Sequence, residues 1–263
     1  MFKVKNQEEF LKTLKREKFF ITATQTFILI FLFLIWELLS ENNIINSFIY
    51  SSPSRILETI FSLYKDGSLF THIYTTIYET IIAFTLGISI GFIIAIILYE
   101  FKIIAKIIEP FLVVLNSLPK VALGPLIIII VGANTKSIIV MALLINLIIN
   151  ITTIYSGFLG TDENTIKLFD SLKASSMQKL RYLIIPSSGK IIISSLKLNI
   201  STSLIGVIMG EFLTSKAGLG YLIIYGTQVF NLNLVMSGIL ILALISFILY
   251  KTIEVIEKKL IKN

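Results

Sequence analysis

The sequence predicts an all-α polytopic membrane protein with about six transmembrane helices. Its 263 residues are 55% hydrophobic and only 15% charged, and the mean hydropathy is +0.88. A soluble domain of this length needs more polar surface to cover its core. Six apolar runs reach the roughly 20 residues that a helix needs to cross about 30 Å of hydrocarbon. Because a helix satisfies its own backbone groups in lipid, we expect these runs to be helices rather than strands.

The six expected spans are separated by loops of different lengths, the longest at 40–73 and 158–190. The first span follows a basic leader, MFKVKNQEEFLKTLKREK. No small-residue cleavage site follows this span, so we expect it to remain uncleaved. The chain then divides into a basic N-terminal segment, 1–18, and a transmembrane domain, 19–263, interrupted by a polar segment at about 158–190. The spans lie near 19–39, 74–98, 111–131, 137–157, 191–213 and 233–251.

The distribution of positive charge orients these spans. With both chain ends on the inner side, 17 of the 23 Lys and Arg residues fall in or beside inner segments, and four fall in outer loops. Such an excess is the positive-inside pattern. It accounts for the net charge of +7 without any nucleic acid partner. We therefore expect a multi-pass protein of the cell membrane with both termini in the cytoplasm.

Several kinds of chemistry are absent from the sequence. The chain has no cysteine and one histidine, His72, so it offers neither thiolate metal ligands nor a histidine cluster. The single Gly-Lys pair, Gly189–Lys190, lacks the rest of a phosphate-binding loop. We find no catalytic constellation and no cluster of intramembrane carboxylates of the kind that marks an ion relay. We expect no metal site, no cofactor and no enzymatic activity in this chain.

The second span carries a small residue at every fourth position. Such a stripe lets two helix backbones approach closely. It fits packing within one subunit or, alternatively, the seam of a dimer. The candidate packing residues are Ala83, Gly87, Gly91 and Ala95.

Proline interrupts the third span at Pro110, Pro119 and Pro125. Each proline removes a helical hydrogen bond and favours a kink, which transporters use near binding sites. Lys120, in the same stretch, either faces a cavity or extends its ammonium group to the inner interface.

Neutral polar side chains recur at helical spacing in the fourth and fifth spans. At membrane depth such residues face protein or water rather than lipid. They fit hydrogen bonds between helices or the lining of a solute pathway, and a carboxylate near the outer end of the fifth span fits either an interfacial position or that pathway. The candidate pathway residues are Asn116, Ser117, Asn146, Asn150, Asn199, Ser203 and Glu211.

Two outer loops have a pattern of their own. The loop at 40–73 contains an amphipathic patch, ILETIFSLY, which fits a helix on the membrane surface. The loop at 214–232 is semi-apolar and too short to span. It fits a gate element, with Gly218 and Gly220 as candidate residues, or an ordinary connecting loop.

The polar segment at 158–190 is expected to hold two short helices. TDENT is a helix-start signal, and Ile166, Phe169 and Leu172 then follow at helical spacing. A turn of small residues precedes a second helix, which we expect Pro186 to interrupt. An amphipathic helix on this side fits the membrane surface or a partner's groove equally well.

Five stretches together resemble the permease subunit of binding-protein-dependent ABC importers, in the branch that serves nitrate, sulfonates and taurine. They are SSPSRILETI, HIYTTIYETIIAFTLGISIG, EPFLVVLNSLPKVALGPLIIIIVG, LKASSMQKLRYLIIP and GVIMGEFLTSKAGLGYLI. The resemblance implies a type I importer fold, and it implies that the cytoplasmic segment couples the permease to an ATPase subunit. The residues it assigns to coupling are Ile166, Phe169, Leu172, Lys173, Ala174, Ser175 and Pro186.

The coupling segment departs from the family pattern at two places. Lys167, Leu168 and Phe169 stand where the family has Glu-Ala-Ala, and Lys173 stands at the family's glycine. Since glycine permits a tight turn, Lys173 predicts a looser turn or a differently shaped ATPase surface.

The resemblance also implies a set of partners. These are a second permease copy, two subunits that bind ATP and Mg²⁺, and an extracytoplasmic solute-binding protein. The alternatives are a secondary transporter or channel without an ATPase, a membrane-embedded enzyme or scaffold, and the membrane subunit of an exporter or vitamin transporter.

Overall fold

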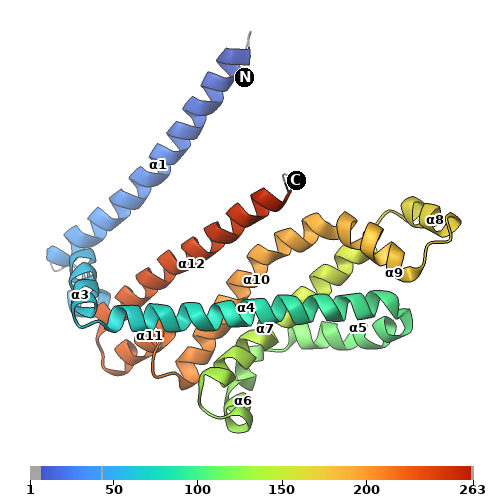
Figure 1. Ribbon diagram of the computed structural model, residues 1–263. Helices are drawn as coiled ribbons and strands as arrows, with labels where there is room; N and C mark the ends of the chain where they lie inside the picture. The colour runs from blue at the N-terminus through green and yellow to red at the C-terminus, as the bar shows by residue number, and fades with distance from the viewer. Residues whose placement is uncertain (1–6, 43, 262–263) are drawn as a thin grey trace.

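The computed structural model describes residues 7–42 and 44–261, and every regular element in that part of the chain is helical (Figure 1). Lys3, Lys5 and Lys262, which contribute to the predicted inner charge, lie outside the described residues. Five helices are long and apolar enough to cross a membrane, and a bent helix pair is a sixth candidate. The predicted all-α polytopic fold with about six spans is therefore confirmed. The long helices are α1 (Gln7–Glu41), α4 (Ser68–Glu100), α7 (Thr135–Leu159), α10 (Ile185–Thr214) and α12 (Leu232–Ile261).

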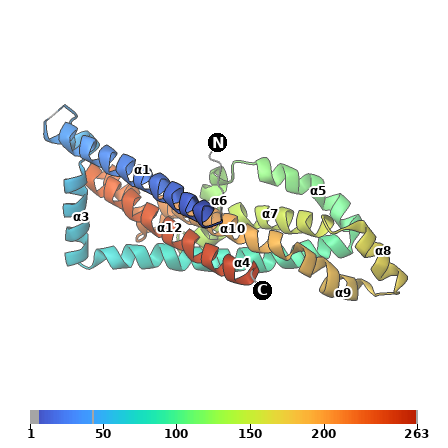
Figure 2. The ribbon, with the colours of Figure 1, turned by 90° about the horizontal axis from the view of Figure 1, so that it is seen from above.

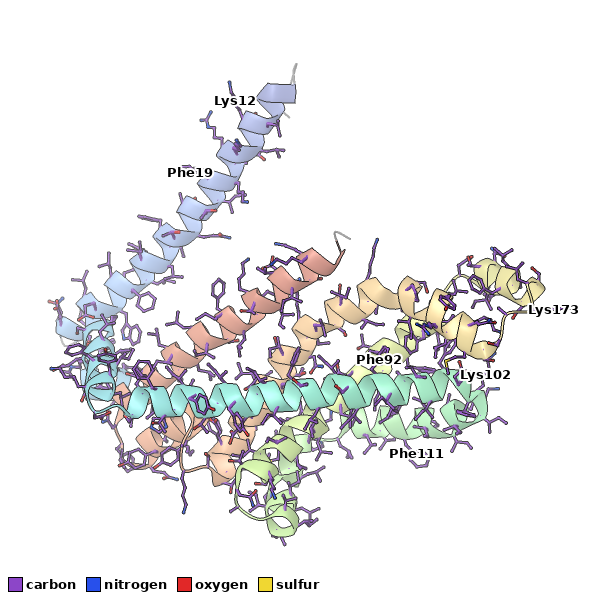
Figure 3. The ribbon with its side chains drawn as sticks, viewed as in Figure 1. Lys12, Phe19, Phe92, Lys102, Phe111 and Lys173 are labelled. Atoms are coloured by element: carbon purple, nitrogen blue, oxygen red, sulfur yellow. The ribbon has the colours of Figure 1, made fainter. Side chains whose placement is uncertain are left out.

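Helix α1 extends away from the central helices (Figure 1), although it lies above α12 in the view of Figure 2. It is continuous across residue 18, so residues 7–18 and the first span form one helix. Most of its apolar side chains between Leu11 and Leu38 are exposed, and that of Phe19 extends away from the other helices (Figure 3). The contacts of α1 are mainly with α2 (Ser47–Tyr50) and α3 (Pro53–Lys65).

Helices α4, α7 and α10 pack against one another and form the centre of the molecule. A Cβ atom on Gly87 of α4 would lie 2.8 Å from the Cγ of Asn146 on α7, and one on Gly91 would lie 2.8 Å from the Cβ of Asn150. Glycine at these two positions therefore permits the close approach of the two backbones. The small-residue stripe of α4 lies in this contact within the chain, with all four members buried: Ala83, Gly87, Gly91 and Ala95.

The third predicted span, 111–131, is not one helix. The chain forms α5 (Lys102–Ser117), a 3-10 turn (Lys120–Leu123) and α6 (Gly124–Val131). The two arms of this pair are bent by 90°. Two of the three prolines account for the bend.

Leu118 has an extended backbone, with φ −65° and ψ 138°, because the ring of Pro119 disfavours a helical residue before it. Pro125 lies in the first turn of α6, where its missing N–H costs no hydrogen bond. The third proline, Pro110, lies inside α5 without ending it.

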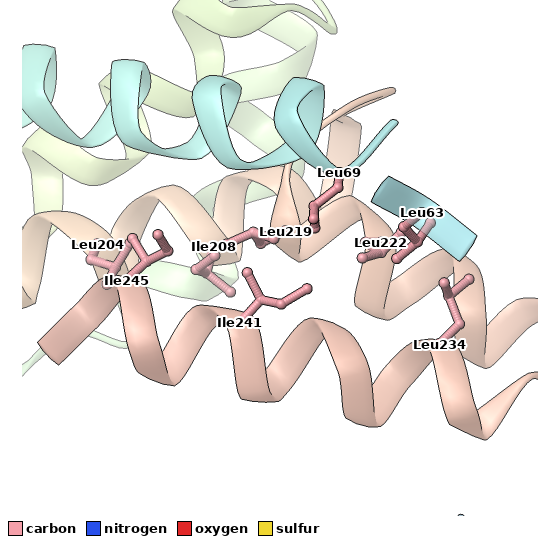
Figure 4. Close-up of a cluster of buried hydrophobic side chains, with 9 residues drawn as sticks. All are labelled: Leu63, Leu69, Leu204, Ile208, Leu219, Leu222, Leu234, Ile241 and Ile245. Carbon is pink, nitrogen blue, oxygen red and sulfur yellow. The ribbon is translucent and has the colours of Figure 1, made fainter. Parts of the chain in front are cut away.

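Helices α3, α11 (Leu219–Gln228) and α12 meet α4 and α10 at one end of the molecule (Figure 1). The predicted amphipathic patch forms α3, and the predicted outer loop at 214–232 contains a packed helix, α11. Ser52 caps α3 by accepting the N–H of Arg55 at 3.4 Å. These elements share one hydrophobic cluster (Figure 4), which consists of Leu63, Leu69, Leu204, Ile208, Leu219, Leu222, Leu234, Ile241 and Ile245.

The opposite end holds α8 (Glu163–Ser171), α9 (Ser176–Lys179) and a π-helical turn (Leu180–Ile184). The expectation that Pro186 interrupts this region is wrong, since the chain stays helical from Ser176 to Thr214. Pro186 falls in the first turn of α10, directly after the π-helical turn. The wider π turn directly before Pro186 accommodates the proline ring without a break in the helix.

Candidate functional site

The segment predicted to couple to an ATPase folds as a capped helix followed by a tight turn. Asp162 begins α8, because its carboxylate accepts the N–H of Thr165 at 2.9 Å and the hydroxyl of Thr165 at 2.7 Å. These hydrogen bonds from Thr165 lower the pKa of Asp162 below its usual value. The cap satisfies backbone donors that the first turn of a helix leaves free.

Helix α8 ends in a left-handed residue, Lys173, whose φ is 56°. The N–H of Ala174 donates to the carbonyl of Phe169 at 3.0 Å, and that of Lys173 donates to the carbonyl of Asp170 at 2.9 Å. This pair of bonds is the Schellman arrangement, in which glycine is the usual left-handed residue. The expectation of a looser turn is therefore wrong: the lysine adopts the glycine-type conformation.

Helix α9 follows directly and is bound to α8 by an ion pair. Ser175 and Gln178 form a reciprocal capping box at the start of α9. The Nζ of Lys179 then donates to the Oδ1 of Asp170 at 2.8 Å, which ties α9 back to α8. We call residues 162–184 the coupling hairpin, after the role predicted for them from the sequence. Its tip carries Lys173 and lies at the same end of the molecule as Lys102 (Figure 3).

The two faces of α8 have different environments. Ile166 and Phe169 pack inward against a cluster around Phe158 and Ile184. Leu168 and Leu172 are 56% and 71% exposed, and Met177 on α9 is 67% exposed. Two predicted coupling residues, Ile166 and Phe169, thus fix the hairpin to its own membrane helices. Sequence reasoning missed the exposed positions Leu168 and Met177, although the i, i+4 spacing of Leu168 and Leu172 marks a second apolar face.

Four candidate pathway residues form a buried group between α4, α7 and α10. The Nδ2 of Asn146 donates to the carbonyl of Ala83 at 3.1 Å and to the hydroxyl of Ser203 at 2.6 Å. That hydroxyl donates in turn to the Oδ1 of Asn199 at 3.2 Å. In this conformation the four residues, which include the buried Asn150, lie between the helices of one chain.

Asn116 and Ser117 lie outside this group. Both are exposed at the end of α5. The Nζ of Lys120 donates to the carbonyl of Asn116 at 3.2 Å, and the hydroxyl of Ser117 donates to the carbonyl of Val114. The structure therefore separates the candidate pathway residues into two groups.

The carboxylate of Glu211 binds the first turn of α11. Its carboxylate is buried, and it accepts the hydroxyl of Thr76 at 2.6 Å and the N–H of Gly220 at 2.5 Å. The N–H of Leu219 donates to the same threonine oxygen at 2.8 Å. Gly218 has φ 114°, and a Cβ atom there would collide with the Glu211 carboxyl group. Both candidate gate glycines thus lie against this carboxylate.

A second carboxyl group lies beside Glu211, contrary to the expectation that the spans hold no carboxylate cluster. Glu79 of α4 is 1% exposed, and its neighbours are the Glu211 carboxyl and the Thr135 hydroxyl. Neither Glu79 oxygen makes a hydrogen bond of ordinary geometry to a described residue. No spacing pattern in the sequence marks this pair, because its members are 132 positions apart on different helices. Among the described residues no group of three or more His, Asp or Glu side chains is placed to hold a metal ion.

The packed apolar helices are the architecture of a multi-pass membrane protein. A family model described as "binding-protein-dependent transport system inner membrane component" matches residues 87–262. The chain belongs to this family.

Curated relatives of known name match most of the chain. A probable ABC transporter permease protein of Haemophilus influenzae is 27% identical over 85% of this chain and 90% of that protein. The putative aliphatic sulfonates transport permease SsuC of Bacillus subtilis is 26% identical over 87% and 83%. The taurine transport permease TauC of Escherichia coli is 20% identical over 86% and 84%.

Solved structures share the fold. A structure of the MetNI methionine ABC transporter, described as inward facing, matches with a TM-score of 0.65 and 17% identity, covering 77% of this chain and 98% of that chain. An amino acid ABC transporter matches with a TM-score of 0.60 and 21% identity, covering 76% and 95%.

Proposed function

We propose that this chain is the membrane-spanning permease subunit of an ATP-driven importer, in which two copies of the chain work with two separate ATPase subunits and an extracytoplasmic binding protein. ATP and Mg²⁺ bind to the ATPase subunits, and this chain carries out no hydrolysis. The observation that supports the proposal most directly is the coupling hairpin. It presents exposed apolar residues at its tip while it is anchored to the membrane helices at its base.

The hairpin has the mechanical properties that ATP coupling requires. An ATPase bound to Leu168, Leu172 and Met177 contacts α8 and α9, which the Asp170–Lys179 ion pair holds together. The inward contacts of Ile166 and Phe169 carry a displacement of α8 to α4, α7 and α10. Because these helices are close-packed, they move as a unit and reorient a pathway between the two permease copies.

The solute is a small molecule of the nitrate, sulfonate, taurine or vitamin-precursor class. Relatives are named for aliphatic sulfonates, taurine, formylaminopyrimidine and riboflavin. This range of names on similar chains supports a system in which the binding protein selects the solute.

Proline at Leu172 tests the coupling role. The N–H of Leu172 donates to the carbonyl of Leu168 at 3.1 Å. Leu172→Pro removes this bond and displaces the preceding residue from its helical backbone. We expect loss of ATP-coupled uptake with normal membrane insertion, measured in proteoliposomes that contain the ATPase and binding protein encoded by neighbouring genes.

The matched variant Leu172→Ala separates the backbone from the side chain, since it removes the apolar contact and leaves the hydrogen bond. Unchanged uptake in Leu172→Pro would exclude the hairpin as the coupling element. Uptake that proceeds with neither ATP nor an ATPase subunit would instead support a secondary transporter or channel.

A further inference from the structure

Two buried carboxyl groups are neighbours inside the helical body. Glu79 on α4 and Glu211 on α10 are each 1% exposed, and both belong to candidate membrane spans. Two like charges buried side by side repel each other and lose their hydration, so a pair of this kind does not remain doubly ionised. Something must neutralise at least one of the two charges.

Basic side chains do not supply this neutralisation. Lys136 next to the start of α7 and Lys216 between α10 and α11 are both exposed. Neither forms an ion pair with Glu79 or Glu211 in the described part of the chain. His72 accepts the N–H of Gly218 on its Nδ1 at 3.1 Å, so that nitrogen carries no proton. Tyr221, whose ring stacks on that of His72, is not a basic residue.

The two carboxyl groups differ in their hydrogen bonds. Glu211 accepts the Thr76 hydroxyl and the Gly220 N–H at the start of α11, where the helix dipole also favours a negative charge. Glu79 has one potential donor beside it, the Thr135 hydroxyl, and receives no hydrogen bond of ordinary geometry from the described residues. Donors stabilise the ionised form of a carboxyl, whereas a carboxyl without donors is better suited to the neutral acid, which has an O–H to donate.

We propose that Glu79 and Glu211 together bind one proton, which Glu79 holds and donates in a hydrogen bond to the Glu211 carboxylate. In the protonated pair, the hydrogen bond between the two carboxyl groups joins α4 to α10. Through Glu211, it also holds the first turn of α11 in place. Loss of the proton leaves two adjacent carboxylates, and their repulsion releases α11 from α4. This site is independent of which solute or ATPase the chain works with.

Infrared difference spectroscopy of the purified full-length chain in nanodiscs tests the proton directly. At neutral pH the wild type is expected to show the C=O stretch of a buried protonated carboxyl, shifted in D₂O. Glu79→Gln should remove this band, and the control Glu58→Gln, an exposed carboxylate on α3, should leave it unchanged. Absence of the band from the wild type, or its survival in Glu79→Gln, would overturn the proposal.

Thermal unfolding across pH tests the asymmetry between the two residues. A glutamine at 79 mimics the neutral acid, so the Tm of Glu79→Gln at neutral pH should stay within about 2 °C of the wild type. A glutamine at 211 loses the charge that its donors stabilise, so Glu211→Gln should fall by more than about 5 °C. The reverse order of the two variants would refute the assignment of the proton to Glu79.

The pH dependence has a defined sign. The folded chain holds one proton more than the unfolded chain at neutral pH, so its Tm should fall as the pH rises into the alkaline range. Glu79→Gln should lack this fall. In the wild type alone, the protection factors of the amides of residues 218–222, which correct for the base-catalysed rise in intrinsic exchange, should fall as the pH rises. That fall would report the release of α11. A wild-type Tm that depends on Na⁺ or K⁺ at constant pH and ionic strength would instead assign the site to a metal cation.

Discussion

At Lys173 the backbone adopts a conformation that costs a lysine more than a glycine. A residue with a Cβ in the left-handed region is strained by about 1–2 kcal/mol, and part of this is offset because glycine loses more chain entropy on folding. We expect Lys173→Gly to raise the local stability of the hairpin by about 0.5–1 kcal/mol. Hydrogen exchange of the α8 and α9 amides measures this change.

The matched control is Lys167→Gly, in the middle of α8. There the backbone is helical, so glycine should lower local stability by about 1 kcal/mol. Faster exchange in both variants would show that the left-handed turn carries no strain. The lysine side chain itself is exposed at the tip, where it is free to contact an acidic partner surface.

Asn146 holds the three central helices together through one amide. We expect Asn146→Ala to lower the free energy of unfolding by about 1–2 kcal/mol, because two buried hydrogen bonds are lost between helices. Thermal unfolding in detergent should show a Tm lower by about 2–8 °C. Asn116→Ala, at an exposed position on α5, is the control and should leave the Tm unchanged. Equal effects of the two variants would contradict the role of the buried group.

Single residues show where sequence reasoning stops. The polarity and spacing of Asn146 and Asn199 indicated that they face protein or water. Which partners they contact depends on how α4, α7 and α10 cross, and no local pattern encodes those crossings. The same holds for Glu79, whose role depends on a residue in another helix. Phe169 has helical spacing toward one face, yet the direction of that face, inward or outward, is set by tertiary packing.

At the scale of helices, α10 and α12 are joined by an ion pair. The ammonium of Lys197 on α10 contacts the carboxylate of Glu257 on α12, which also accepts the Ser194 hydroxyl at 3.2 Å. We expect either Lys197→Glu or Glu257→Lys alone to lower the Tm in detergent, because each places two like charges together. The double exchange should recover most of the loss. No recovery would show that the pair contributes through packing rather than charge.

Helix length, polarity and a proline kink in the third span were predictable, whereas the proline at which the chain bends was not. The apolar runs of α4, α7 and α12 are long enough that only a spanning helix fits them. The run at 111–131 has the same composition, and its 90° bend comes from the effect of Pro119 on Leu118. Pro110, by contrast, remains inside a helix. Both residues are proline, so whether the helix continues or bends depends on the surrounding packing.

At the scale of the whole molecule, the charge distribution predicts the orientation in the membrane. The chain has no cysteine, so single cysteines report accessibility without a background. Met177 in the coupling hairpin and Phe230 before α12 are 67% and 77% exposed. We expect Met177→Cys to react with an impermeant maleimide only after the membrane is permeabilised, and Phe230→Cys to react in intact cells.

Labelling of both positions from the same side would contradict the predicted topology. The cysteine-free parent chain serves as the control for non-specific labelling. In the structure these two positions lie at opposite ends of the helical body, since the coupling hairpin and the loop before α12 occupy opposite ends of Figure 1.

The isolation of α1 has a consequence for biogenesis. Its contacts are mainly with α2 and α3, and none of its residues belongs to the buried clusters around α4, α7 and α10. During synthesis α1 precedes α4, α7 and α10, so it enters the bilayer before any helix that forms those clusters exists. Its insertion and the later packing of the core are therefore separate events in time. Helix α1 therefore holds the growing chain at the membrane before α10 has been synthesised, and so before the contacts between α4 and α10 can form.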